Sequence, residues 1–176
     1  MTQKILKTKK YSPLKTAIIY TTTYGTTEKV ANYIAEKLHY KNIDVVELKH
    51  NTDFDVSPYD IVILGASVYL GDIQHTMSNF CKRNLEVLLT KKIGLFICGI
   101  EPELVRQDTE LEMAFPLNLY NYALATAFVG GEINLEALNA SQKFITTSLL
   151  GIKESASFIQ YDLIDIFINQ LQIASE

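Results

Sequence analysis

KTAIIYTTTYGTTEKVA, residues 15–31, carries the clearest signal of fold in this chain. Its first part, Lys15–Tyr20, is mostly β-branched or aromatic, which predicts a buried strand. The hydroxyl-rich run TTTYGTT (residues 21–27) then ends that strand. From residue 27 to residue 40 apolar residues recur at helical spacing, which predicts a helix. A strand that leads through a short loop into a helix is the beginning of a βαβ unit.

The rest of the chain repeats this alternation of strands and helices. Short apolar runs predict further strands at residues 44–48, 61–64, 93–98 and 124–129. Periodic segments predict helices at residues 74–90, around 108–123, at 135–151 and at 162–173. Such an order implies right-handed crossovers, and therefore an α/β domain with a doubly wound parallel sheet and helices on both of its faces.

The length of 176 residues is enough for one domain with a sizeable core and too short for two ordinary domains. The net charge of −4 is unevenly spread, because residues 1–50 carry nine lysines against four acidic residues. We predict a basic N-terminal extension over residues 1–14, followed by a single domain over residues 15–176. The remaining chain is acidic and would repel phosphate backbones, so nucleic acid is not an expected partner.

Several classes of site are excluded by composition and spacing. Cys81 and Cys98 lie far apart without a CxxC spacing, which argues against a disulfide scaffold or a zinc site and favours a reducing cytoplasm. The three histidines are scattered, so no metal site is predicted. No apolar run is long enough for a transmembrane helix. A receiver-type phosphorylation domain needs carboxylates where residues 21–22 are Thr-Thr and residues 65–66 are Gly-Ala.

Three loops are expected to form the functional site, because ligands bind open parallel sheets beyond the carboxyl ends of the strands. The loop after the first strand, residues 21–27, offers hydroxyls, one glycine and the amides of a helix N-terminus, which suits a phosphate group. Alternatively, Thr26 or Thr27 simply caps the helix. The loops at residues 65–73 and 98–103 suit a planar ring, with Tyr69 as a stacking partner or as a cover for the strand end.

YTTTYGTTEKVA (residues 20–31) resembles the FMN-phosphate loop of flavodoxins, and GASVYLGDI (residues 65–73) resembles their second flavin loop. The similarity covers the chain from about residue 15 to its end. It is closest to the flavodoxin-like branch that includes menaquinone-dependent protoporphyrinogen oxidase, which has an insertion after the fifth strand, here about residues 130–160. The resemblance implies a flavodoxin-like five-stranded parallel sheet in the order 2-1-3-4-5 and one non-covalently bound FMN.

The resemblance also implies a set of cofactor-binding residues. The phosphate would be held by Thr22, Thr23, Tyr24, Gly25, Thr26 and Thr27. The isoalloxazine ring would be lined by Ser67, Val68, Tyr69, Leu70 and Gly71. The third loop would close the other side of the ring with Cys98, Gly99 and Ile100. Three acidic residues expected near the ring edge, Asp72, Glu101 and Glu103, would lower the flavin potential.

Two redox functions are open at this point, and no residue is assigned a catalytic role. The main expectation is an FMN-binding oxidoreductase similar to protoporphyrinogen oxidase, which passes electrons to a quinone; the insertion favours it. The alternative is a one-electron carrier between partner proteins, which the excess of acidic residues favours. A flavin-free interaction module is disfavoured by the threonine-rich loop.

The insertion is amphipathic and has two interpretations of its own. Its apolar face would consist of Leu138, Phe144, Ile145, Leu149 and Leu150. This face is expected to pack against the edge of the sheet; the other interpretation is that it docks peripherally on a membrane.

Overall fold

The computed structural model describes residues 14–39, 42–69, 72–149 and 151–173. The predicted basic extension lies outside the described residues, apart from Leu14. Two residues proposed for the second flavin loop, Leu70 and Gly71, also lie outside them, as does the side chain of Tyr69.

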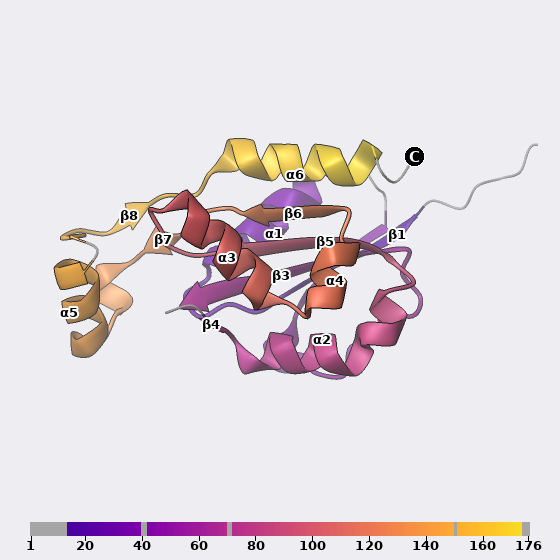
Figure 1. Cartoon of the computed structure of the whole chain (residues 1–176), viewed down its shortest axis with the longest axis horizontal. Coiled ribbons are helices and arrows are strands. Elements are labelled where there is room, and N and C mark those ends of the chain that lie inside the picture. Colours follow the sequence, from indigo (N-terminus) through magenta and orange to yellow (C-terminus); the bar gives the residue numbers. More distant parts are fainter. Residues whose placement is uncertain (1–13, 40–41, 70–71, 150, 174–176) are drawn as a thin grey trace, which may run out of the picture.

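A parallel sheet forms the centre of the molecule (Figure 1). Its strands are β1 (Lys15–Tyr20), β2 (Asn42–Glu47), β3 (Ile61–Tyr69), β5 (Lys92–Cys98) and β6 (Ala125–Phe128). They pair in the order β2-β1-β3-β5-β6, and every one of these pairs is parallel. This is the predicted doubly wound order 2-1-3-4-5, so the fold class is confirmed. An unpredicted short strand, β4 (Asp72–Ile73), pairs antiparallel with the end of β3.

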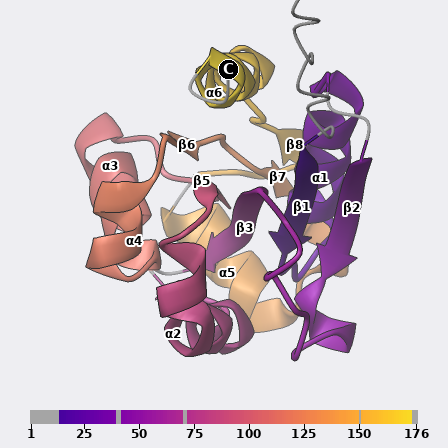
Figure 2. The same ribbon diagram turned by 90° about the vertical axis from the view of Figure 1, so that its right-hand side faces the viewer.

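Helices cover both faces of the sheet (Figure 2). One face is covered by α1 (Thr26–Lys37) and α6 (Tyr161–Ile173). The other is covered by α2 (His75–Leu88), α3 (Leu104–Ala114) and α4 (Leu117–Tyr122). None of the helices within the described ranges has both the length and the apolarity needed to cross a membrane.

The two hydrophobic cores follow from the alternation of side chains along the central strands. Ile18 and Phe96 point to the face under α1 and α6, where Phe96 meets Phe167 at a ring-centroid distance of 6.2 Å. The neighbouring Ile19 and Leu95 point to the opposite face, under α2, α3 and α4. All five side chains are buried, and burial of this kind is the main stabilising contribution in a domain of this size.

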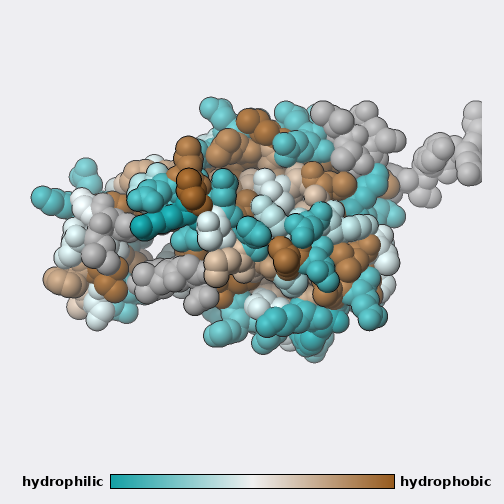
Figure 3. Space-filling model, in the orientation of Figure 1, coloured by the Kyte–Doolittle hydropathy of each residue, from teal (hydrophilic) through white to brown (hydrophobic). Residues whose placement is uncertain are grey.

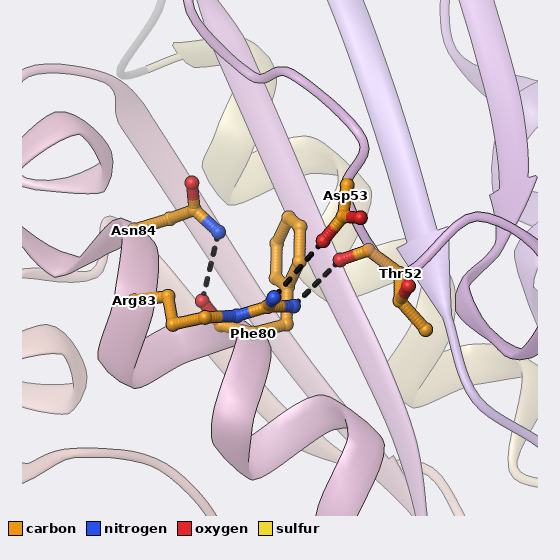
Figure 4. A network of polar contacts seen from close by, with 5 residues as sticks. All are labelled: Thr52, Asp53, Phe80, Arg83 and Asn84. Carbon is orange, nitrogen blue, oxygen red and sulfur yellow. Dashed lines mark hydrogen bonds and ion pairs between the residues drawn. The ribbon is translucent and has the colours of Figure 1, made fainter.

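A polar network fastens α2 to the segment that follows the short 3₁₀ helix η1 (Leu48–His50) (Figure 4). Arg83 Nη1 lies 3.0 Å from Asp53 Oδ1, and Arg83 Nη2 donates to the carbonyl oxygen of Thr52 at 2.7 Å. Within the helix, Asn84 donates to the carbonyl oxygen of Phe80 at 3.0 Å. The contacts of Arg83 tie α2 to this loop, and the residue just before α2, Gln74, belongs to the site described below.

Most predicted elements agree with the observed ones to within a few residues, and three differ more. β3 continues past Leu64, because Ser67 still pairs with Cys98 of β5 and Val68 with Ile73 of β4. The helix predicted around 108–123 is divided into α3 and α4 at residues 115–116, since Pro116 lacks the amide that a continuous helix needs. The predicted helix 135–151 begins later, at α5 (Ala140–Leu149), after a 3₁₀ turn η2 (Leu135–Ala137).

Asn139 explains this later start of α5. Its side-chain oxygen accepts a hydrogen bond from the amide of Gln142 at 2.9 Å, while Gln142 Oε1 accepts one from the amide of Asn139 at 3.1 Å. Two amides at the helix start are thereby satisfied reciprocally, as in a capping box.

The segment between β6 and α6 projects beyond the carboxyl ends of the strands (Figure 1). It consists of β7 (Glu132–Ile133), η2, α5 and β8 (Ala156–Ser157), with β7 and β8 paired antiparallel. Its two ends meet, because the amide of Phe158 donates to Gly131 O at 2.7 Å and the amide of Gln160 to Val129 O at 2.9 Å. The expectation that its helix packs against the sheet edge is wrong: α5 lies past the strand ends, since the paired β7 and β8 carry it outward.

Candidate functional site

A pocket of about 590 Å³ opens at the carboxyl ends of β1, β3 and β5. All three predicted loops reach it, and the predicted residues that line it are Thr22, Thr23, Tyr24, Thr26, Ser67, Val68, Cys98, Gly99 and Ile100. Figure 3 shows the molecule hollowed on this side, between the outlying α5 and the body of the domain. Gly25 and Thr27 belong to the same first loop but are not among the residues that line the pocket.

The first loop is built to turn sharply into α1. Gly25 has φ +88°, a left-handed conformation that glycine adopts without strain, and its amide donates to Thr22 Oγ1 at 3.0 Å. Gly25 occupies the cap position, and no side chain of the described residues caps the helix, so the interpretation of Thr26 or Thr27 as the cap is wrong. Within the described residues, the amides of Thr26 and Thr27 have no hydrogen-bond partner.

Thr27 contributes a polar group that the protein leaves unpaired. Its side chain is fully buried, and among the residues that the structure describes its Oγ1 finds no hydrogen-bond partner. A buried hydroxyl without a partner is destabilising by about 1–3 kcal/mol. An acceptor group brought to the start of α1 could remove that cost.

Gln74, which sequence reasoning missed, joins the first loop to the second. It is the residue before α2, and its Oε1 accepts hydrogen bonds from Thr21 Oγ1 at 2.8 Å and from the amide of Ser67 at 3.3 Å. Its Nε2 donates to Thr23 Oγ1 at 3.2 Å and to Ser67 Oγ. No motif marks this glutamine, because its partners lie in other segments of the chain.

The third loop packs closely against the second. A methyl group placed on Gly99 would lie 3.2 Å from the ring of Phe128 and 3.7 Å from Val68 Cβ, so the glycine permits this close approach. Cys98 is buried, and burial raises the pKa of its thiol to about 12, which keeps it protonated and unreactive. Burial also raises the pKa of the Cys81 thiol to about 12, with the same consequence.

The segment after β6 forms a further wall of the pocket, which was not predicted. It contributes Gly131, Glu132, Ile133, Asn134, Leu138, Gln142, Ile145 and Thr146 to the lining. Two contacts link it to the first loop and α1: Tyr24 Oη donates to Gln142 Oε1 at 2.9 Å, and Lys29 Nζ lies 2.6 Å from Glu132 Oε1. The hydrogen bond from Lys29 lowers the pKa of Glu132.

The charges of the pocket are divided between its walls. The wall near α3 contains Glu101 and Glu110, and burial, followed by the charge of Glu101, raises the pKa of Glu110. Arg106 is the single basic residue in the described lining, and its Nε lies 3.0 Å from Glu103 Oε2. The wall near α1 contains threonine hydroxyls, and the carboxylate on that side, Glu132, is paired with Lys29 of α1. A dianionic group is therefore favoured near α1 and disfavoured near α3.

Residues 17–157 match the model of a protein family described as the flavodoxin domain. A flavodoxin of Maridesulfovibrio salexigens is 37% identical over 94 residues, which are 48% of this chain and 63% of that relative. The match thus spans less than two thirds of the relative's length. A flavodoxin structure from Streptococcus pneumoniae TIGR4 has a TM-score of 0.52 at 18% identity, covering 90% of this chain and 98% of that one. A flavodoxin, WrbA-like protein from Agrobacterium tumefaciens has a TM-score of 0.52 at 13% identity, covering 92% and 96%.

Proposed function

Because the chain belongs to the flavodoxin domain family, we propose that it binds one FMN non-covalently in this pocket and acts as an electron carrier. The flavin supplies the redox chemistry, while the protein binds it, orients it and sets its potential. A pocket of about 590 Å³ is within the range that holds a cofactor of this size.

The start of α1 is the observation that carries this proposal. Among the described residues, the amides of Thr26 and Thr27 and the buried hydroxyl of Thr27 have no acceptor, and a phosphate oxygen would supply one. The left-handed Gly25 makes the turn that places these groups at the start of α1. Tyr24 would take part through its amide, since its hydroxyl is bonded to Gln142. The phosphate would be held by Thr22, Thr23, Tyr24, Gly25, Thr26 and Thr27.

The ring would lie between the second and third loops. Ser67 and Val68 line the pocket on one side, and Cys98, Gly99 and Ile100 line it on the other. Tyr69, Leu70 and Gly71 complete this proposed set. Free, buried thiols at Cys81 and Cys98 are compatible with a reducing cytoplasm as the location.

FMN titration tests the proposal directly. The purified protein is expected to take up one equivalent of FMN, to turn yellow and to quench the flavin fluorescence. FMN-loaded protein should also unfold at a higher temperature, because a ligand that binds only the folded state stabilises it. Neither quenching nor a thermal shift at saturating FMN would contradict the proposal.

The acidic residues of the pocket wall near α3 favour an electron carrier over an enzyme that acts on an anionic substrate. Glu101 and Glu110 face the pocket, and Arg106 is already paired with Glu103, so a substrate with two carboxylates would be repelled there. An acidic rim attracts basic partner proteins and raises their association rate. Acids beside the ring also lower the flavin potential, because they disfavour an anionic reduced flavin.

A second candidate function is an oxidase-like flavoprotein that passes electrons to a quinone. The observation in its favour is the additional wall, where Ile133, Leu138 and Ile145 give an apolar surface for a neutral ring. The two functions differ under anaerobic conditions. A carrier should pass electrons rapidly to a basic haem protein and slowly to menaquinone analogues, without turning over protoporphyrinogen. Saturable reoxidation by menaquinone analogues with protoporphyrinogen turnover would establish the oxidase instead.

A further inference from the structure

The side chain of Gln74 joins the first loop to the second. Both of its polar atoms, Oε1 and Nε2, form hydrogen bonds with residues of each loop. The orientation of its amide is determined by the protein. The backbone N–H of Ser67 can only donate, so the group that faces it at 3.3 Å must be the oxygen Oε1. The nitrogen Nε2 then faces Thr23 Oγ1 and Ser67 Oγ.

This orientation leaves two hydroxyl hydrogens free. Nε2 has no lone pair to offer, so the hydroxyls of Thr23 and Ser67 must act as acceptors toward it. Neither hydroxyl donates to any other residue that the structure describes, and both residues line the pocket. Their hydrogens can therefore point into the pocket as donors.

We infer that Gln74 is a positioning residue that sets the hydrogen-bond polarity of the pocket, making Thr23 and Ser67 donors for the acceptor groups of FMN. The inference rests on the proposed function. The hydroxyl of Thr22 is also held as an acceptor, but by the amide of Gly25, so its hydrogen is likewise available to a ligand. The pocket thus presents three hydroxyl donors and selects an acceptor-rich ligand, with Thr23 on the phosphate side and Ser67 on the ring side.

Gln74→Glu and Gln74→Met separate this role from that of a simple structural link. A carboxylate can still accept from Thr21 and from the Ser67 amide, so it keeps the loops joined, but it also accepts from the Thr23 and Ser67 hydroxyls and turns their hydrogens away from the pocket. Methionine breaks every contact and leaves both hydroxyls free to donate into the pocket. A carboxylate here also repels the FMN phosphate, so the two variants are compared with uncharged riboflavin. For riboflavin, polarity control predicts that the glutamate change is the more harmful one, whereas a structural link predicts the reverse.

The experiment is a fluorescence titration of each variant with FMN and with riboflavin, which lacks the phosphate. We expect Gln74→Glu to weaken FMN binding by about 30-fold or more, as two hydrogen bonds to a charged ligand are lost. Gln74→Met should lose less than about tenfold, in keeping with the loss of neutral contacts. The preference for FMN over riboflavin should fall in Gln74→Glu. Gln170→Glu, which adds the same charge on an exposed position of α6, should bind FMN as the wild type does.

Each outcome has a distinct meaning. If the wild type does not bind FMN, the proposed function fails. If the wild type binds FMN but Gln74→Glu binds riboflavin as tightly as the wild type, or more tightly than Gln74→Met does, this inference alone is overturned. Should Gln74→Glu not fold by circular dichroism, Thr23→Val and Ser67→Ala decide the question. Each should weaken FMN binding several-fold, and wild-type affinity in both would overturn the inference.

Discussion

The Thr22→Ala/Thr27→Val double variant is expected to bind FMN about 100-fold more weakly than the wild type, or worse. Two hydroxyls that would donate to the phosphate are removed, and each hydrogen bond to a charged group contributes about 1.5–3 kcal/mol. Thr22 additionally holds the amide of Gly25 at 3.0 Å, so its loss also loosens the turn into α1. Fluorescence or calorimetric titration measures the affinity.

Riboflavin and a second threonine provide the controls. Riboflavin affinity should change little, because that ligand has no phosphate for the two hydroxyls to contact. Thr52→Ala, at an exposed threonine that joins the network of Figure 4 only through its backbone carbonyl, should leave both affinities unchanged. Equal losses for FMN and riboflavin would refute the assignment of this loop to the phosphate.

Thr27→Val alone carries an additional signature. Valine has nearly the same shape as threonine but no hydroxyl, so the change removes the orphaned Oγ1 without leaving a cavity. The FMN-free protein should therefore be as stable as the wild type or more stable by about 1 kcal/mol, while its FMN affinity falls. Chemical denaturation without and with FMN measures the two effects separately.

Gly130→Ala is expected to lower the free energy of unfolding by about 3 kcal/mol. The residue has φ +73°, where an L side chain is strained by about 1–2 kcal/mol, and overpacking costs typically another 1–3 kcal/mol. A methyl group there would lie 2.0 Å from the carbonyl oxygen of Phe158, so the backbone must move. That movement would disturb the hydrogen bond from the Gly99 amide to Gly130 O, 3.1 Å long, and with it the third loop.

Gly151→Ala is the matched control for this variant. Gly151 has a similar φ of +67°, but no atom of the described residues lies within 4 Å of the methyl group it would gain. In Gly151→Ala the free energy of unfolding should fall only by the cost of the left-handed conformation, about 1 kcal/mol, and the FMN affinity should not change. Urea denaturation compares the two, and equal losses would show that the contact with Phe158 is unimportant.

The fold could be predicted because its signals are local. Strand Lys15–Tyr20, the loop after it and the periodicity of α1 lie in consecutive residues, and the alternation repeats along the chain. The break between α3 and α4 was equally local, since Pro116 marks it, but helical periodicity continues across the proline and conceals the two shorter helices.

The site was predictable only where it follows from the strand ends. Parallel strands bring the three loops together whatever their side chains, so the pocket-lining residues beside those ends could be predicted. Gln74 bonds to Thr21 across 53 residues, and Tyr24 to Gln142 across 118. Such pairs depend on the final packing of separate elements, and the residues involved carry no local pattern that distinguishes them from surface amides.

The paired ends of the segment from Glu132 to Ser157 have a consequence for how this protein can diversify. The chain leaves the core at Val129–Gly131 and returns at Phe158–Gln160, where backbone hydrogen bonds join the two ends. For the sheet, the whole segment between them is therefore equivalent to one closed loop. The entropy of closing a loop grows only with the logarithm of its length, so insertions and deletions within this segment are thermodynamically mild. The length and sequence of this wall of the pocket can thus change, in evolution or by design, while the strands, the first loop and Gln74 keep their positions.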